Sequence, residues 1–272
     1  MDTKTDQLIR FMLPKQRVRG CFIRGKHIKA EAIRIHGLHG EIATMFSQLL
    51  LGTILLLSIN KGGVRQVLQV DSTAATPLPI QRMLAEVRAG CVRGFVRWHE
   101  HHSKKMDDQK DIAAWMGIPL LVSTVRDSGM GEPYVSTIES DATYLADHLL
   151  RFLTQSVQTR ADIVLHDETA IMLEAMPGCS DAHWFEAIGA LAKISHDDLI
   201  AADETILHHG FDTLGLQIVG RDAYRWHCGC QPKRMAESLQ KMPKEQLADL
   251  VDDDGYIGVS CQYCCQEHKI LI

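Results

Sequence analysis

The C-terminal part of the chain holds two closely spaced pairs of cysteines. The first pair has the form Cys-x-Cys and consists of Cys228 and Cys230; the second has the form Cys-x-x-Cys and consists of Cys261 and Cys264. Four thiolates in two close pairs can surround one zinc ion tetrahedrally when the intervening residues bring the pairs together. The spacing therefore predicts one zinc ion per reduced chain, bound by these four cysteines.

The same cysteines could respond to oxidants. Zinc holds its ligands as thiolates, the form of cysteine that oxidants attack, and two thiolates one or two residues apart can close a disulfide after the metal leaves. In a cytosol that keeps thiols reduced, such a site would act as an oxidant sensor. The Cys-x-Cys spacing and the additional thiol of Cys265, next to Cys264, favour this interpretation over a purely structural zinc ribbon, which is the alternative.

No catalytic constellation accompanies the cysteines. The sequence has no metalloprotease, phosphate-loop or nucleophile-elbow motif. A zinc ion with four cysteine ligands also has no open position for water or substrate. The His-rich run 99–102 is interpreted as part of a solvated loop because Lys104, Lys105 and two aspartates continue it. We therefore predict that the protein is not an enzyme.

Three isolated cysteines are interpreted as buried small hydrophobic residues: Cys21, Cys91 and Cys179.

Composition and charge limit the partners and the location. The net charge of −5 at pH 7 offers no general attraction to nucleic acid, whose binding needs a basic surface. The first residues carry charges where a signal peptide would be apolar, so we predict a cytoplasmic protein. The uncharged run 42–60 is long enough to cross a bilayer. Its interspersed Ser, Thr, Gln and Gly residues instead favour a helix in the core and no membrane association.

The residues before the cysteines predict an α+β fold with a mainly antiparallel sheet and packed helices. Besides a helix-like start at 6–13 and the helix at 42–60, apolar alternation and turn residues predict seven strands. Asp141 is expected to cap the helix that carries Leu145 and Leu149. The predicted strands are 18–24, 64–70, 90–98, 119–126, 133–138, 162–166 and 170–175, with 119–126 and 133–138 forming a hairpin.

Two further segments follow this first domain, which we place at residues 1–176. Residues 177–225 are predicted to form a helical linker, with Trp184, Ile188 and Leu191 on one apolar face and a second helix at 197–209 ending at Gly210. Helices this short are not stable alone, so their apolar faces must lie against a neighbouring domain. Residues 226–272 are predicted to form a small zinc-binding domain, with a helix expected to begin at Pro232.

The cysteine motif and its surroundings resemble the heat-shock protein 33 family. The tail WHCGCQPKRMAESLQKMPKEQLADLVDDDGYIGVSCQYC looks like the family's redox switch. The segments GEPYVSTIESDATYLADHLLRFLTQSVQTRADIVL and IMLEAMPG are similar to its chaperone domain, and DQLIRFML with VRG is similar to its N-terminus. The likeness covers nearly the whole chain, although only the cysteine motif is highly specific. Members usually have Gly where this chain has Cys265.

The resemblance implies a redox-regulated, ATP-independent holdase, a chaperone that binds unfolding client proteins under oxidative stress. The reduced, zinc-bound form would be inactive. Oxidation would release zinc, join Cys228 to Cys230 and Cys261 to Cys264, unfold the switch and linker, and in many members produce a dimer. Two alternatives from other functional classes are a nucleic-acid-binding protein with a zinc module and a thiol oxidoreductase. A basic surface around the zinc module would support the former, but residues 228–272 contain more Asp and Glu than Lys and Arg.

Overall fold

The computed structural model separates into two compact units, Met1–Trp226 and His227–Ile272. It describes residues 4–59, 64–76, 78–99, 109–200, 203–243, 246–247, 249–252 and 254–271. The strands are β1 Asp6–Leu13, β2 Val18–Arg24, β3 Arg65–Ser72, β4 Ile80–Arg88, β5 Cys91–Trp98, β6 Leu120–Asp127, β7 Tyr134–Ser140, β8 Ala161–His166, β9 Thr169–Ala175, β10 Gln217–Trp226, β11 Tyr256–Ser260 and β12 Glu267–Leu271. The helices are α1 Lys26–His36, α2 Gly40–Ile59, α4 Ile112–Met116, α5 Leu145–Phe152, α6 Asp181–Leu191, α7 His196–Ile200, α8 Thr205–Phe211 and α9 Pro232–Leu239, with a π-helical turn at Leu153–Val157 and a 3-10 turn at Asp212–Leu214.

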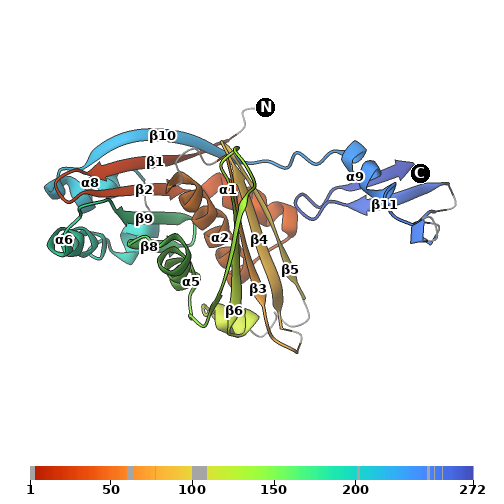
Figure 1. The fold of residues 1–272 in the computed structure, drawn as a ribbon, viewed down its shortest axis with the longest axis horizontal. Helices are drawn as coiled ribbons and strands as arrows, with labels where there is room; N and C mark the ends of the chain where they lie inside the picture. Colours follow the sequence, from red (N-terminus) through yellow and green to blue (C-terminus); the bar gives the residue numbers. More distant parts are fainter. Residues whose placement is uncertain are drawn as a thin grey trace. The chain divides into compact units, whose positions relative to one another are not determined.

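Strands β1 to β10 of the described residues form one sheet in the first unit, in the order β7-β6-β3-β4-β5-β10-β1-β2-β9-β8. Every neighbouring pair in this order is antiparallel except β10 and β5. These two strands pair in parallel only at Arg225 with Cys91 and Trp226 with Val92. The sheet therefore has two antiparallel halves that meet at the end of β10 (Figure 1). The predicted α+β class and the β6–β7 hairpin are confirmed.

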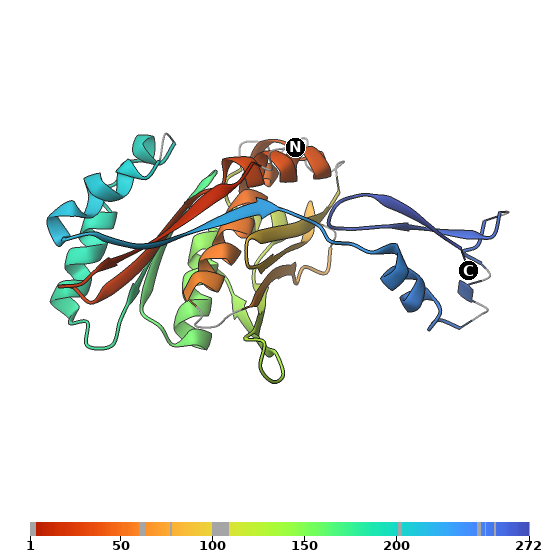
Figure 2. The ribbon, with the colours of Figure 1, turned by 90° about the horizontal axis from the view of Figure 1, so that it is seen from above.

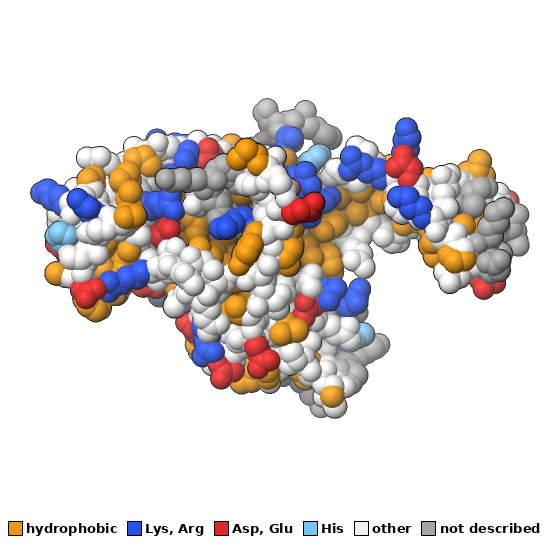
Figure 3. All heavy atoms as spheres, viewed as in Figure 1, with side chains coloured by type: hydrophobic (Ala, Val, Ile, Leu, Met, Phe, Trp, Pro, Cys, Tyr) orange, Lys and Arg blue, Asp and Glu red, His pale blue; other side chains and the backbone are white. Residues whose placement is uncertain are grey.

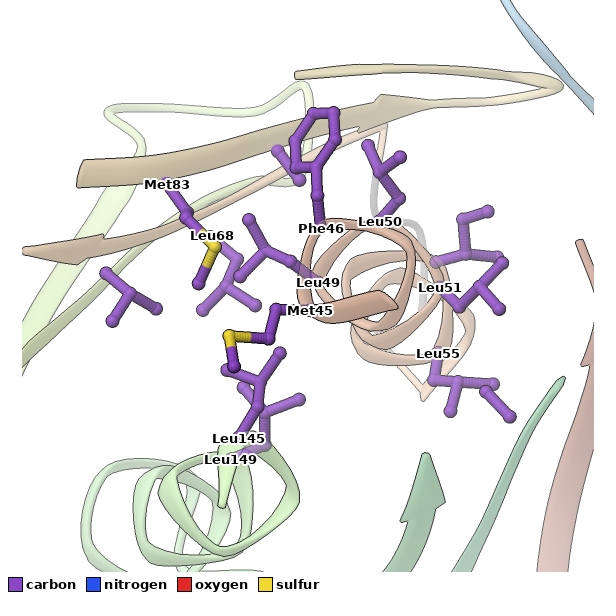
Figure 4. Packing of buried hydrophobic residues seen from close by; sticks show 14 of the residues in the cluster. Met45, Phe46, Leu49, Leu50, Leu51, Leu55, Leu68, Met83, Leu145 and Leu149 are labelled. Atoms are coloured by element: carbon purple, nitrogen blue, oxygen red, sulfur yellow. The ribbon is translucent and has the colours of Figure 1, made fainter. Parts of the chain in front are cut away.

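Helix α2 forms the centre of the core between the two halves of the sheet. It contacts β2, β8 and β9 on one side and β3, β4 and β5 on the other. Figure 4 shows its side chains among Leu68 and Met83 of the sheet and Leu145 and Leu149 of α5. By length and composition α2 could cross a membrane, but 78% of its most apolar window is buried inside the protein. The predicted core helix is confirmed.

Helices α6 to α8 cover the opposite face of the strands β1, β2 and β9. Because side chains alternate along a strand, each strand contributes residues to both cores. In Figure 2 the β1–β2 hairpin lies between α2 and these helices. The strand residues of the second core are Ile9, Phe11, Leu13, Val18, Phe22, Ile171 and Leu173, and those of the helices include Trp184, Ala187, Leu191, Leu199, Ile206, Leu207 and Phe211. The predicted apolar face of residues 184–191 thus lies against the sheet.

Several predicted elements are wrong. Residues 6–13 form strand β1, paired with β2 and β10, because a short apolar run cannot be assigned from periodicity alone. The stretch 177–225 is helical only as far as Leu214, since its last part belongs to strand β10. Asp141 does not cap α5, whose N-cap is Tyr144, and forms an ion pair with Arg151. Helix α1 and strand β4 were not predicted.

The predicted helix at 197–209 is divided. Helix α7 ends at Ile200, and the chain re-enters a helix at Thr205, whose backbone N–H donates to the Asp203 carboxylate at 2.8 Å. A short acidic side chain that accepts from a backbone N–H two residues on favours a turn over a continuous helix. Gly210 lies inside α8, which runs to Phe211, and is therefore not the residue that ends this helix.

Candidate metal centre

The second cysteine pair is held in a tight turn between strands β11 and β12. The two strands are antiparallel, with Ser260 paired to Glu267 at the end of the ladder. Within the turn, the Cys261 N–H donates to the Gln266 carbonyl at 2.9 Å and the Cys265 N–H donates to the Cys261 carbonyl at 2.8 Å. These hydrogen bonds close the turn that carries Cys261 and Cys264.

The first cysteine pair lies in the extended segment between β10 and α9. Cys228 is two residues beyond the last residue of β10. Helix α9 begins at Pro232, as predicted, since proline suits the first helical turn. Cys228 and Cys230 therefore follow β10 and precede α9 in the sequence, within the second unit.

The structure brings the four paired cysteines together. The Sγ atoms of Cys228, Cys230, Cys261 and Cys264 all lie within 4.8 Å of one another. The Cys228 and Cys261 sulfurs are 3.7 Å apart, and those of Cys230 and Cys264 are 3.5 Å apart. Ligands at about 2.3 Å from a tetrahedral zinc ion have sulfurs separated by about 3.8 Å. The cluster therefore has the dimensions of a four-cysteine metal site.

The local electrostatics are those of crowded thiols. Burial and the neighbouring thiols raise the pKa of Cys228, and the same causes raise the pKa of Cys230 to about 12. Burial also acts to raise the pKa of Cys261, but backbone N–H groups of Cys264 and Tyr263 directed at its sulfur outweigh burial and lower this pKa. Four thiolates at these distances repel one another strongly, so a divalent cation is the species that would stabilise them together.

Cys265 differs from the four clustered cysteines. It is exposed, and its backbone has φ of 56°, the left-handed region that favours glycine. Burial of part of the side chain and the nearby Cys261 raise the pKa of its thiol. Within the described part of the chain, the metal-binding group of His, Cys, Asp and Glu residues contains the four paired cysteines and does not include Cys265.

One polar neighbour of the cluster was not predicted from the sequence. Nε2 of His268, in strand β12, lies 3.4 Å from Sγ of Cys230. The alternation of β12 places His268 and the buried Ile270 on the same face, with exposed residues between and beside them. A histidine on the inner face of a strand that follows a predicted metal ligand is the signal that could have identified it.

The remaining candidate residues lie apart from this site. Cys21 is buried as predicted, whereas Cys91 and Cys179 are only half-buried. His99 Nε2 lies 2.9 Å from the side-chain nitrogen of Gln81. The rest of the His-rich run, residues 100–102, is outside the described residues.

Comparison with known proteins shows the same family over nearly the whole chain. The family model for the Hsp33 protein matches residues 6–270. The 33 kDa chaperonin of Geobacter sulfurreducens is 24% identical, over 97% of this chain and 92% of its own, and that of Lactiplantibacillus plantarum is 23% identical, over 97% and 94%. The crystal structure of the 33 kDa chaperonin of Thermotoga maritima has the same fold, with a TM-score of 0.80 at 18% identity, over 98% of this chain and 94% of that one. The chain therefore belongs to the Hsp33 family.

Proposed function

We propose that this protein is a cytoplasmic, ATP-independent holdase chaperone regulated by the redox state of Cys228, Cys230, Cys261 and Cys264. With one Zn²⁺ on these thiolates it is inactive. Oxidation releases the metal, and the protein then binds unfolding client proteins. The observation that carries this proposal is the cluster of four sulfurs within 4.8 Å of one another in a chain whose relatives are named chaperonins.

The donor set suits zinc. Cysteine sulfur is a ligand that Zn²⁺ binds in closed, four-coordinate structural sites, and sulfur spacings of 3.5 and 3.7 Å match such a site. Among the described residues of the unit His227–Ile272, the buried hydrophobic side chains are Leu247, Ile257, Cys261 and Ile270. A module this small depends on its metal for much of its folding free energy. Loss of the metal would then unfold it.

Oxidation would remove the ligands chemically. A peroxide converts one thiolate to a sulfenic acid, and attack by the neighbouring thiolate forms the disulfide and releases water. We propose the pairs Cys228 with Cys230 and Cys261 with Cys264, because one or two intervening residues keep these partners close after the metal leaves. A disulfide sulfur carries no negative charge and binds Zn²⁺ weakly, so each bridge removes two ligands.

The client surface in this proposal is the sheet face beneath the linker helices. The strands contribute Ile9, Phe11, Phe22, Ile171 and other apolar residues to this face, and helices α6 to α8 cover them. An apolar area of this kind, once exposed, is a binding site for the apolar segments of unfolding proteins. The helices are short, so they persist only while docked. We therefore propose residues 1–176 as the chaperone domain, 177–225 as the linker and 226–272 as the switch, with dimerisation on activation.

The route from the metal to the linker follows the chain. Strand β10 pairs with β1 along most of its length and lies between α8 and Cys228 in the sequence. Its last two residues pair with β5, directly before the zinc module begins. Unfolding of the module would remove the folded anchor at this end of β10. The linker helices, which are attached to the N-terminal end of β10, would then be docked less stably on the sheet.

The alternatives fit the structure less well. On the face shown in Figure 3, Lys and Arg side chains are interspersed with Asp and Glu, which does not provide the basic patch that nucleic acid needs. A thiol oxidoreductase would need a reactive cysteine free to attack a substrate disulfide. Here the paired cysteines face one another in a closed cluster, which favours a switch over a catalyst.

Light scattering of an aggregating client protein tests the proposal directly. The protein is added either reduced and zinc-loaded or after peroxide treatment with mild warming, without ATP. We expect protection by the oxidised form only. Equal protection in both states would remove the redox switch from the function, and no protection in either state would remove the chaperone activity.

A further inference from the structure

His268 lies in strand β12 and contacts a cysteine of the metal site that belongs to a different segment of the module. Its partner across the ladder is Val259 in β11, so its position is fixed by the same strand pair that shapes the turn of Cys261 and Cys264. Its Nε2 lies 3.4 Å from the sulfur of Cys230, 38 residues earlier in the chain. The contact therefore joins the first cysteine pair to the strand that follows the second pair.

The chemistry of the site determines the direction of this contact. A cysteine bound to zinc is a thiolate, which has no proton to donate. The hydrogen bond in the metal-bound state must therefore run from Nε2–H of the imidazole to the sulfur. We propose that His268 is a positioning residue that donates a hydrogen bond to the Cys230 thiolate. This hydrogen bond would set the affinity of the site for zinc and the rate at which an oxidant reacts with the Cys230 sulfur. This proposal rests on the zinc site of the proposed function.

The geometry favours an outer hydrogen-bond donor over a fifth ligand. The four sulfurs, all within 4.8 Å of one another, already supply the complete tetrahedral set for zinc, and the His268 nitrogen is not a member of this group. Groups that hydrogen-bond to metal ligands orient them and tune the metal, and their removal costs about 10-fold to 100-fold in metal affinity. A hydrogen bond also draws charge from the thiolate, which makes the sulfur a weaker nucleophile toward peroxide.

Two substitutions of similar size separate the hydrogen bond from the packing. His268→Leu removes the N–H donor but retains bulk on the inner face of β12, whereas His268→Gln retains an N–H donor. Lys269→Ala is a matched control, because Lys269 is the exposed neighbour on the same strand. For each protein, zinc affinity is measured by competition with a chelator, and zinc release by peroxide is followed with a chromogenic chelator. The sulfur-to-metal charge-transfer band is recorded after replacement of zinc by Co²⁺.

We expect His268→Leu to bind zinc about 10-fold more weakly than the wild type. It should also release zinc several-fold faster in peroxide, with the charge-transfer band at longer wavelength because the thiolate is richer in electrons. His268→Gln should return toward the wild type, and Lys269→Ala should equal it. Equal behaviour of the Leu and Gln variants would overturn the proposal, as would X-ray absorption evidence for a nitrogen ligand in the wild type. Absence of bound zinc in the wild type would instead refute the metal site itself.

Discussion

The aromatic ring of Phe11 in strand β1 lies 5.3 Å, centroid to centroid, from that of Phe211 in helix α8, with the two planes tilted by 31°. Both side chains are fully buried. This contact joins the last linker helix to the sheet face that we propose as the client surface. Because α8 leads through a 3-10 turn into β10, the same region is joined along the chain to the strand whose last residue, Trp226, precedes Cys228 by two residues.

Undocking the linker should activate the reduced protein. Trp184 of α6 is buried against the sheet, and replacing it with Glu places a charge in an apolar contact, at a cost of about 3–5 kcal/mol. We expect Trp184→Glu, and equally Leu191→Glu, to protect a client with zinc bound and cysteines reduced, while hydrogen exchange in residues 181–211 accelerates.

The neighbouring residue provides the control for this experiment. Phe185 is 62% exposed, so Phe185→Glu introduces the same charge on the outer side of the same helix and should leave the reduced protein inactive. A Trp184→Glu variant whose linker exchanges rapidly without protecting a client would show that undocking does not produce activity.

Removing one thiol ligand should abolish tight zinc binding. We expect elemental analysis to give one zinc per reduced wild-type chain, and much less than one for Cys228→Ser, Cys230→Ser, Cys261→Ser or Cys264→Ser, because a serine hydroxyl binds zinc poorly. Cys265→Ser should retain the full content, since Cys265 is outside the cluster. Full zinc in Cys228→Ser or Cys261→Ser would contradict the ligand assignment, and loss in Cys265→Ser with retention in Cys264→Ser would move one ligand.

The oxidised protein should contain two disulfides between sequence neighbours. Before oxidation every pairing of the four sulfurs is within reach, since all lie within 4.8 Å of one another. After the module unfolds, only the partners one or two residues apart remain at high local concentration. Peptide mass mapping after peroxide treatment should therefore show Cys228 joined to Cys230 and Cys261 joined to Cys264. A dominant bridge from Cys264 or Cys265 to Cys21, Cys91 or Cys179 would mean that the switch operates through other thiols.

Replacing Cys265 with glycine should stabilise the zinc module. The residue has φ of 56°, a conformation that costs a residue with a Cβ atom about 1–2 kcal/mol and glycine almost nothing. We expect Cys265→Gly to keep its zinc and to need more chelator or heat for zinc loss than Cys265→Ala, which also lacks the thiol but keeps the Cβ atom. Equal stability of the Gly and Ala variants would show that the backbone strain at this turn is negligible.

The first unit should lose stability in mild acid through His148. This side chain is fully buried in α5, where its Nδ1 lies 2.8 Å from the hydroxyl of Ser140. Burial and the nearby Arg151 lower its pKa below the ordinary value of 6.5. The unfolded chain therefore binds a proton at a higher pH than the folded chain does, so the free energy of unfolding decreases as the pH falls below about 6.5.

Urea unfolding at pH 7.5 and 5.5 measures this effect. His148→Asn can keep a hydrogen bond to Ser140 but does not titrate, so its unfolding midpoint should change less between the two pH values than that of the wild type. Because the wild-type imidazole is well packed, the variant should be less stable at pH 7.5 by about 1–3 kcal/mol. The same pH dependence in both proteins would assign the acid sensitivity to other groups, such as His166, whose pKa burial also lowers.

Local patterns in the sequence were sufficient for features that depend on local chemistry. The uncharged run 42–60 predicted the core helix, because its length suits a helix and its interspersed polar residues disfavour a membrane span. The glycine-bearing connection predicted the β6–β7 hairpin, and Pro232 marked the first turn of α9. The four cysteines that the structure brings together were chosen from their spacing, since two close pairs of thiols can surround one metal ion tetrahedrally.

Only the tertiary structure decided the features that depend on partners distant in the sequence. Residues 6–13 became a strand because β2 and β10 supply hydrogen bonds on both sides, and residues 217–226 became β10 by pairing with β1 rather than continuing the linker as a helix. The position of His268 beside Cys230 depends on the pairing of β11 with β12, which no single segment encodes. Strand pairing and the approach of a side chain to a remote thiol are contacts between distant residues, and local periodicity contains no information about which distant residue completes them.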